Sequence, residues 1–155
     1  MEITYHQATT NDINDLVEKR IQFSIEFSGA QPEEIIQALR IQLIKYLSKA
    51  LVGQSCISFI AKADGHAVGI GSMHVREMPA NFKNMTGKWG YIMNMYTVPE
   101  FRRKGICKQI LNLLVNEGKR LGIGCFELHA TQVGEMVYKN NGFTMHNEPT
   151  YRMYI

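Results

Sequence analysis

The stretch over residues 91–121 restricts the fold of this chain more than any other part of the sequence. A run of β-forming residues ends at Pro99, a basic turn follows over 102–105, and apolar residues then recur at helical spacing. We interpret this as a strand over 89–98, a turn, and a helix over 103–121. A strand that enters a helix through a short glycine-containing turn brings unpaired N–H groups together at the positive end of the helix dipole. The sequence therefore predicts a phosphate-binding site at this turn.

The basic character of this turn indicates a ligand with more than one phosphate. The cationic side chains around it are Arg102, Arg103, Lys104 and Lys108. Gly105 has no side chain and permits the backbone to approach a ligand closely. The turn contains neither the G-x-x-x-x-G-K-[ST] pattern of a P-loop nor the G-x-G-x-x-G pattern of a Rossmann site. We expect a ligand that carries two or three phosphates and that is bound by neither of these two motifs.

The rest of the sequence predicts an α/β order with a parallel crossover at its centre. Segments with β-type patterns predict strands, helical apolar spacing predicts helices, and Gly, Pro and Asn mark their ends. The expected strands are 3–8, 55–62, 66–75, 89–98, 125–131 and a last one from 143 onward; the expected helices are 13–29, 32–53, 103–121 and 134–141. Because the strand at 125–131 follows a helix, it should lie parallel to the strand at 89–98.

Composition argues against several classes of protein. With 155 residues, 45% of them hydrophobic and 20% charged, the chain is long enough for one domain with its own core. A net charge of +3 without a long basic run gives no indication of nucleic-acid binding.

No apolar run approaches the roughly 18 residues of a membrane helix. The N-terminus also lacks the layout of a signal peptide, so we expect a cytoplasmic protein. The three cysteines lack ligand spacing, which predicts free thiols and no metal.

Two motifs resemble those of a known enzyme family. Residues 102–107 read Arg-Arg-Lys-Gly-Ile-Cys, which resembles the acyl-CoA signature [RQ]-x-x-G-x-[GA] of the GNAT superfamily of N-acyltransferases, with Cys107 in place of Gly or Ala. The Val-Pro-Glu at 98–100 and the apolar helix after the motif are also typical of the family. Residues 134–143 resemble a second family pattern, A-x-x-[LV]-Y-x-x-x-G-F, except for Gly134 at the Ala position. The resemblance covers nearly the whole chain.

The resemblance implies a fold and an acyl donor. The fold would be an α/β, GNAT-like mixed central sheet with an antiparallel N-terminal half and a parallel βαβ crossover at the cofactor site, in a single N-acetyltransferase domain over 1–155. The donor would be acetyl-CoA, with its pyrophosphate on the amides of 103–108 and its pantetheine arm between two splayed parallel strands. A β-bulge near Asn94 and Met95 would open this gap and aim an amide at the thioester. The cofactor-binding residues implied are Met95, Tyr96, Thr97, Val98, Arg102, Arg103, Lys104, Gly105, Ile106, Cys107, Lys108, Thr131 and Tyr138.

Tyr138 and Asn94 are the catalytic candidates. By resemblance to the family, Tyr138 lies near the sulfur, and we expect it to give a proton to the departing thiolate once charge has developed there. A phenol keeps its proton up to about pH 10, whereas a thiol loses its own near about pH 8.5. Without the resemblance, Tyr138 would be interpreted as a packing residue of a short helix. Asn94 lies where the thioester should point.

The sequence does not identify the general base, the residue that removes a proton from the acceptor amine. Glu127, His129 and Thr131 share one face of their expected strand, and histidine is a frequent general base. A lone histidine without a visible partner is nevertheless more often structural than catalytic. His74, Asn94 and a chain of water molecules are further candidates.

Cys107 has two interpretations. A cysteine at a helix N-terminus beside cations should have a lowered pKa and could act as a nucleophile. The sequence shows no histidine and carboxylate relay to support covalent catalysis. We therefore interpret Cys107 as a small packing residue of the turn.

The leading hypothesis is direct transfer of an acetyl group from acetyl-CoA to a primary amine of a small molecule or peptide that the sequence does not identify. The first two helices, the loop over 76–88 and the last strand should surround this acceptor. The alternative is a non-catalytic acyl-CoA-binding sensor or interaction module on the same fold, favoured by the lack of an obvious carboxylate base before the motif. Nucleic-acid binding through 102–104 is less favoured, because the cationic footprint is small. An apolar last strand with an exposed edge is consistent with a homodimer.

Overall fold

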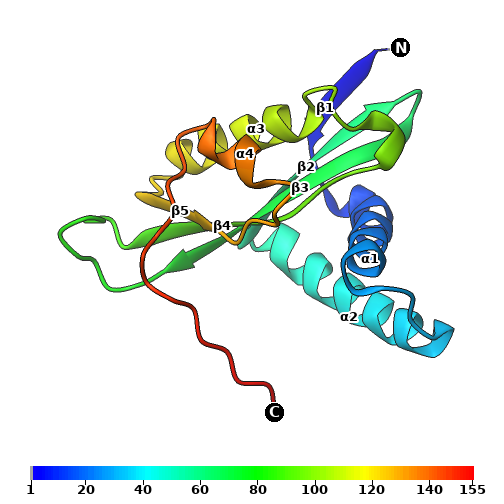
Figure 1. The fold of residues 1–155 in the computed structure, drawn as a ribbon, viewed down its shortest axis with the longest axis horizontal. Helices are drawn as coiled ribbons and strands as arrows, with labels where there is room; N and C mark the ends of the chain where they lie inside the picture. Colours follow the sequence, from blue (N-terminus) through cyan, green and yellow to red (C-terminus); the bar gives the residue numbers. More distant parts are fainter. Residues whose placement is uncertain (1) are drawn as a thin grey trace.

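The computed structural model describes residues 2–155 and contains a five-stranded sheet in the order β1-β2-β3-β4-β5. The strands are β1 (Ile3–Gln7), β2 (Cys56–Ala63), β3 (His66–Glu77), β4 (Lys88–Thr97) and β5 (Cys125–Leu128). Neighbouring strands from β1 to β4 pair antiparallel, and β4 pairs with β5 in parallel. The predicted mixed sheet with a parallel crossover is confirmed (Figure 1).

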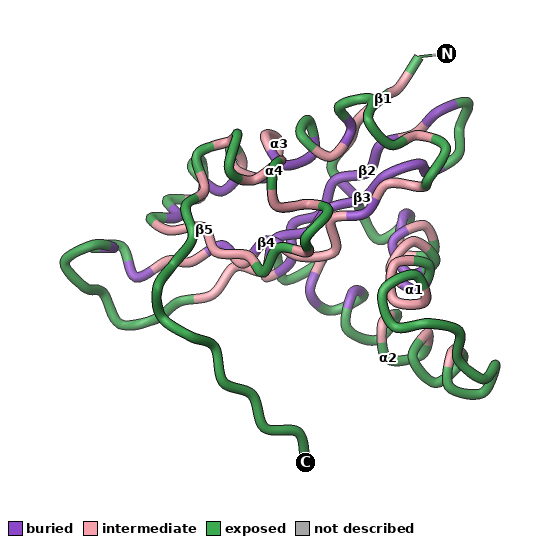
Figure 2. The backbone as a smooth tube through the Cα atoms, in the orientation of Figure 1, coloured by how far each residue is buried: buried purple, intermediate pink, exposed green. Residues whose placement is uncertain are grey.

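Helices cover both faces of this sheet. They are α1 (Ile13–Ser28), α2 (Glu33–Val52), α3 (Ile106–Arg120) and α4 (Glu135–Lys139), with the short 3-10 helices η1 (Thr10–Asp12) and η2 (Pro99–Phe101). Figure 1 shows α3 and α4 on one face and α1 and α2 on the other. Because side chains alternate along a strand, the neighbours Phe59 and Ile60 of β2 enter two different buried clusters, one on each face. Buried residues are accordingly frequent along the central strands β2 and β3 (Figure 2).

Two glycines of β3 permit close packing of α3. A Cβ atom at Gly71 would lie 2.5 Å from side-chain atoms of Ile110 and Met95, and a Cβ atom at Gly69 would lie 2.7 Å from Ile106. Carbon atoms in favourable contact are about 3.5 to 4.0 Å apart, so no larger residue fits without a shift. The N-terminal half of α3 is thereby held tightly against the sheet.

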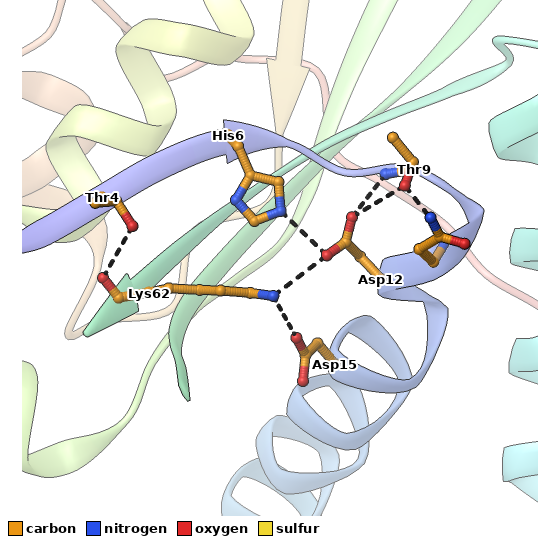
Figure 3. A network of polar contacts seen from close by, with 7 residues as sticks. Thr4, His6, Thr9, Asp12, Asp15 and Lys62 are labelled. Carbon is orange, nitrogen blue, oxygen red and sulfur yellow. Dashed lines mark hydrogen bonds and ion pairs between the residues drawn. The ribbon is translucent and has the colours of Figure 1, made fainter. Parts of the chain in front are cut away.

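A polar network fixes the start of α1 on the sheet (Figure 3). Asp12 accepts a hydrogen bond from the Thr9 backbone N–H (3.0 Å) and pairs with His6 Nε2 (3.1 Å) and Lys62 Nζ (3.4 Å). Lys62 also pairs with Asp15 at 3.2 Å. Burial alone would raise the pKa of Asp12, but the Thr9 hydrogen bond and the neighbouring His6 and Lys62 outweigh it, and the pKa falls to about 2. The network joins β1, β2 and α1 and so fixes how α1 lies on the sheet.

The prediction of a last strand from residue 143 onward is wrong. Residues 143–155 pair with no strand, and Tyr151 and Met153 are 88% and 84% exposed. Figure 1 shows this segment passing β5 and extending away from the sheet and helices. Its apolar residues favour a strand, but a strand also needs a partner edge, and Pro149 removes an N–H donor from its middle. The homodimer expected from this segment stays a prediction.

Two of the predicted boundaries that differ from the structure lie beside the expected cofactor site. The helix expected from 103 begins at Ile106, because Arg103 and Gly105 have positive φ angles of 60° and 80° and lie in the turn before it. The strand expected to reach Thr131 ends at Leu128, where its parallel pairing with β4 ends. Both differences place more of the chain in the turns that surround the predicted cofactor site.

The described residues carry no membrane helix and no metal cluster. None of the helices within 2–155 is long and apolar enough to cross a membrane. In the same part of the chain, no group of three or more His, Cys, Asp or Glu could hold a metal ion. The three cysteines are free, as predicted, with Cys56 buried and the other two partly buried.

Candidate active site

The turn between β4 and α3 presents a row of unpaired backbone N–H groups. Arg103 and Gly105 have positive φ angles, and Gly105 is the residue that precedes the first turn of α3. Within residues 2–155 the N–H groups of 103–108 have no acceptor, and the first bond of the helix runs from Gln109 N–H to the Gly105 carbonyl at 3.0 Å. Left-handed residues followed by a helix N-terminus form a concave site for an anion.

Arg102 is already engaged within the protein. Its Nε donates to the Thr97 carbonyl at 2.9 Å, and its Nη2 pairs with Glu26 of α1 at 2.7 Å. Its guanidinium also lies 5.7 Å from the centre of the Tyr96 ring. Arg102 therefore ties the turn to both α1 and β4, and its side chain positions the turn rather than facing an incoming anion.

The other cations of the turn keep their charges available. Among the described residues, no carboxylate lies within ion-pair distance of Arg103, Lys104 or Lys108. Lys104 lies over the ring of Phe101, with its Nζ 4.6 Å from the ring centre. An anion bound to the backbone of the turn would thus meet cations whose charge is not already paired.

A β-bulge interrupts β4 at the residues predicted to face the thioester. Asn94 and Met95 of β4 together lie opposite Gly71 of β3, which confirms the predicted bulge. Asn94 has a φ angle of 56°, a left-handed conformation that asparagine tolerates better than most residues. The bulge turns the two side chains to opposite faces: Met95 packs against Gly71 and the α3 side, whereas Asn94 lines a cavity on the α1–α2 side.

The parallel strands stop pairing where the family resemblance implies a gap, because β5 ends there. β4 and β5 are paired as far as Ile92 and Leu128, and β4 then continues to Thr97 without this neighbour. One edge of β4 is therefore open over 93–97. An open strand edge can pair with an extended chain that contains amide groups.

The residues at the end of β4 have structural contacts of their own. The Tyr96 ring packs against Phe23 of α1, with ring centres 6.1 Å apart. The Val98 N–H donates to the Val68 carbonyl at 3.0 Å, so this group is not available to a ligand. Thr97 Oγ1 is buried without a partner among the described residues. The ligand-binding roles of these three residues stay predictions, and for Val98 the backbone N–H is excluded.

Tyr138 of α4 lies near Cys107 at the start of α3, and its ring packs edge-on to Phe143, with ring centres 6.1 Å apart. Burial, and to a smaller extent the Cys107 thiol, raises the pKa of Tyr138 above its ordinary value of 10.0. Transfer of a proton from such a phenol to a thiolate, whose thiol has a pKa of about 8.5, is uphill by about 2 kcal/mol or more. The role of Tyr138 toward the departing thiolate stays a prediction; a phenol that keeps its proton can donate a hydrogen bond to the sulfur.

The Cys107 thiol is not activated. Burial raises its pKa to about 11, so the lowered pKa expected at this helix terminus is wrong. Loss of solvent outweighs the nearby cations and the helix dipole here. A protonated thiol agrees with the interpretation of Cys107 as a packing residue.

Thr131 and Gly134 form the turn that leads into α4. The Gly134 N–H lies 3.0 Å from the Thr131 carbonyl oxygen and 3.3 Å from its Oγ1. A Cβ atom at Gly134 would lie 3.3 Å from both Thr131 Oγ1 and Tyr138 Cε2, which is tighter than ordinary contact. Glycine at the family's alanine position thus permits the Tyr138 ring to lie against this turn. The role of Thr131 in cofactor binding stays a prediction.

His129 has partners that the sequence did not reveal. The Tyr91 hydroxyl and His129 Nδ1 are 2.8 Å apart, although the two residues are 38 positions apart in the chain. The other ring nitrogen, Nε2, lies 3.3 Å from Thr150 Oγ1. Sequence reasoning missed Tyr91 because the pairing depends on the register between β4 and β5, which places Tyr91 opposite Glu127.

The other candidates for the base are less available. Glu127 pairs with Arg76 at 2.9 Å. The His74 Nδ1 atom is buried and has no partner among the described residues. His129 is thus the candidate whose ring is oriented by a hydrogen bond and not paired with a charge.

A cavity of about 160 Å³ lies between the α1–α2 hairpin and the sheet, beside the bulge. Its lining consists of Leu16, Arg20, Leu43, Tyr46, Leu47, Ile70, Ser72, Met93 and Asn94. Arg20 is the charged residue of this lining, and sequence reasoning missed it because the apolar positions of α1 were used to define the buried face. The available signal was its position four residues after Leu16, on the same face of the helix.

The comparisons with known proteins agree on one family. Residues 21–143 match the sequence model of the acetyltransferase (GNAT) family. No curated protein sequence matches the chain.

Several solved structures are similar over their full length. A predicted acetyltransferase from Clostridium acetobutylicum, solved with acetyl-CoA, has a TM-score of 0.86 and 31% identity, with 98% of this chain and 96% of that chain covered. A GCN5-related N-acetyltransferase from Ralstonia eutropha has a TM-score of 0.85 and 22% identity, with 98% and 99% covered. Glucosamine-6-phosphate N-acetyltransferase from Arabidopsis thaliana has a TM-score of 0.71 and 16% identity, with both chains fully covered (100%). The last two similarities show a shared fold.

Proposed function

Because the chain belongs to the GNAT family of acetyltransferases, we propose that it transfers the acetyl group of acetyl-CoA to a primary amine of a small molecule or peptide. In this proposal the whole chain, 1–155, forms one N-acetyltransferase domain. The observation that carries the proposal is a pair of open backbone segments on either side of η2: the N–H row of 103–108 and the β4 edge over 93–97, which includes the bulge at Asn94. The first segment can hold an anion, and the second can hold an extended amide chain with a thioester at the bulge.

The backbone supplies most of the proposed donor site. The N–H groups of 103–108 bind the pyrophosphate, and the side chains of Arg103, Lys104 and Lys108 add charge around it. The open edge over 93–97 pairs with the amides of the pantetheine arm. Arg102 holds the turn through Glu26 and Thr97.

The chemistry needs a neutral amine, an oxyanion site and a stabilised leaving group. The amine nitrogen forms a bond to the thioester carbon, and a backbone N–H of the bulge at Asn94 and Met95 stabilises the oxyanion. The carbon–sulfur bond then breaks, and the Tyr138 hydroxyl donates a hydrogen bond to the thiolate. The products are an N-acetyl amide and CoA, which regains a proton as its thiol.

His129 is the residue that we assign to the proton of the amine. Tyr91 holds its Nδ1 atom at 2.8 Å, which fixes the orientation of the imidazole. This arrangement has the form of a base held by a second polar group. Tyr91 acts on the ring of His129 and is a positioning residue.

Binding of acetyl-CoA is the first test. Acetyl-CoA should raise the melting temperature of the protein, because a ligand that binds the folded state stabilises it. Arg103→Glu should remove that shift by placing a negative charge in the anion site. Arg40→Glu is the matched control, since Arg40 lies on α2, where it pairs with Glu18, away from the turn. If Arg103→Glu keeps the full shift, the donor does not bind at this turn.

A further inference from the structure

Arg20 brings an unpaired positive charge into the cavity beside Asn94. The residue is half-buried, and its guanidinium carbon lies 5.3 Å from the centre of the Phe23 ring. Within residues 2–155, no carboxylate lies within ion-pair distance of Arg20. By contrast, Arg76 and Arg102 each pair with a glutamate, at 2.9 and 2.7 Å. Arg20 therefore reaches a partly enclosed space with its donors free.

The surroundings of Arg20 contain little that solvates a charge. Most of the residues that line the cavity are apolar, and Ser72 already shares a 2.7 Å hydrogen bond with Ser58. Burial raises the pKa of Tyr46, across the cavity, to about 12, and burial also lowers the pKa of Arg20. A guanidinium still remains protonated in a protein. Holding it in such a place is costly unless a counter-charge is present.

We propose that Arg20 binds an anionic oxygen group of the acceptor, so that the substrate is an amine that also carries a carboxylate or a phosphate. This inference rests on the proposed acetyl transfer, because it places the acceptor between Arg20 and the bulge at Asn94. A guanidinium presents parallel donors that match the oxygens of a carboxylate or a phosphate. The apolar residues of the lining would hold the apolar part of the same molecule.

Matched amines test the substrate class. L-leucine and L-leucinamide differ in the carboxylate, and phosphoethanolamine and ethanolamine differ in the phosphate. We expect kcat/KM to be at least about 10-fold higher for the anionic member of one of these pairs, since a charged hydrogen bond in a desolvated site is lost in the other member. The two pairs also distinguish carboxylate from phosphate.

Variants then assign this preference to Arg20. Arg20→Met keeps an unbranched apolar stem over Phe23 but removes the charge. The ratio of kcat/KM between the anionic and the neutral amine should therefore fall to about 1. Arg20→Lys should retain part of the preference, because the charge remains but the planar fork is lost. Arg40→Met is the matched control, since it removes a cation from the same helical hairpin outside the cavity lining, and it should keep the preference.

A binding measurement separates this inference from the proposed function. The melting temperature is measured with 4-methylpentanoate, 4-methylpentanamide and isoamyl phosphate, which have no amine and cannot be acetylated on nitrogen. An anion-dependent shift that Arg20→Met removes supports the anion site even if no amine is acetylated. If neither the amine pairs nor these probes show an anion preference that depends on Arg20, the inference is overturned, whereas an intact shift with acetyl-CoA leaves the donor site standing.

Discussion

The donor side and the acceptor side of the proposed site are built from different parts of the chain. On the donor side, the groups that would contact a ligand are backbone N–H groups and an open strand edge, over 93–108. On the acceptor side, the cavity is formed by side chains of α1, α2 and the sheet, with Arg20 as its charge. The donor side is set by turn and strand geometry, whereas the acceptor side is set by which side chains happen to meet.

This difference predicts how the two sides respond to mutation. The affinity of a backbone site for its ligand falls when the turn is deformed or when a nearby positive charge is replaced by a negative one. Most conservative changes of side chains near such a site should have small effects on this affinity. In a site built from side chains, a single conservative substitution should change the preference for one ligand over another, as proposed for Arg20.

The largest effect is expected at Tyr138. Tyr138→Phe removes the hydroxyl that would stabilise the thiolate but keeps the ring that packs against Phe143. We expect kcat to fall about 1000-fold, within the range for loss of a positioned catalytic group, with the acetyl-CoA dissociation constant nearly unchanged. Steady-state kinetics and calorimetric titration measure the two quantities. Equal turnover in the variant would reduce Tyr138 to a packing residue.

The next effect is expected at Gly105. A Cβ atom there meets nothing within 4 Å, and aspartate tolerates a positive φ angle better than most residues, so Gly105→Asp should fold with a small backbone strain while it places a negative charge at the anion site. We expect about 100-fold weaker binding of acetyl-CoA. Gly105→Asn tolerates the φ angle of 80° and lacks the charge, so it should bind nearly as well as the natural protein. Gly65→Asp in the β2–β3 turn is the matched control, because Gly65 has the same φ angle of 80° and a Cβ atom there also meets nothing within 4 Å. Equal losses for Asp and Asn at position 105 would contradict an anion site.

An intermediate effect is expected at Asp12, which holds α1 on the sheet. Because its folded-state pKa of about 2 is below the unfolded value of about 3.9, its contribution is present above pH 4 and is lost as the pH falls toward 2. Asp12→Asn should lower the free energy of unfolding by about 2 kcal/mol at pH 7 and have little effect at pH 2. Urea unfolding at both pH values tests this, with Asp64→Asn in a hairpin turn as the control. A difference that persists unchanged at pH 2 would show that charge is not the cause.

The smallest effect is expected at the ion pair between Glu26 and Arg102. Both side chains are partly exposed, at 46% and 39%, and such pairs contribute only about 0 to 1 kcal/mol. Glu26→Gln should change the KM for acetyl-CoA by no more than about 3-fold, because Arg102 keeps its hydrogen bond to the Thr97 carbonyl. A change as large as that of Gly105→Asp would show that the arginine side chain, not the backbone, controls the donor site.

The sequence predicted those parts of the molecule that depend on local rules. Residues 91–121 contain a strand signal, a glycine turn and a helix signal in immediate succession, and the mixed sheet with its parallel crossover followed from them. The bulge at Asn94 and the gap between β4 and β5 were also expected, but from the family resemblance. The motif at 102–107 predicted the donor side well, because few residues outside the motif and the strand before it are needed to form the donor side.

The features that the sequence did not predict depend on long-range contacts. The pairing of Tyr91 with His129 depends on the register of β4 and β5, and the position of Arg20 depends on how the α1–α2 hairpin lies on the sheet. Burial reversed the expected pKa shift of Cys107, and burial is a property of the folded chain. The segment from 143 onward has the composition of a strand, but composition does not supply a partner edge.

Amine-dependent release of CoA tests the central claim most directly. The protein is incubated with acetyl-CoA and a panel of amines. The release of free thiol is measured after subtraction of background hydrolysis, and the mass of the acceptor is determined by mass spectrometry. We predict that at least one amine stimulates thiol release and gains one acetyl group for each CoA released. Tight binding of acetyl-CoA with no amine that stimulates release would contradict acetyl transfer and would favour an acyl-CoA sensor on the same fold.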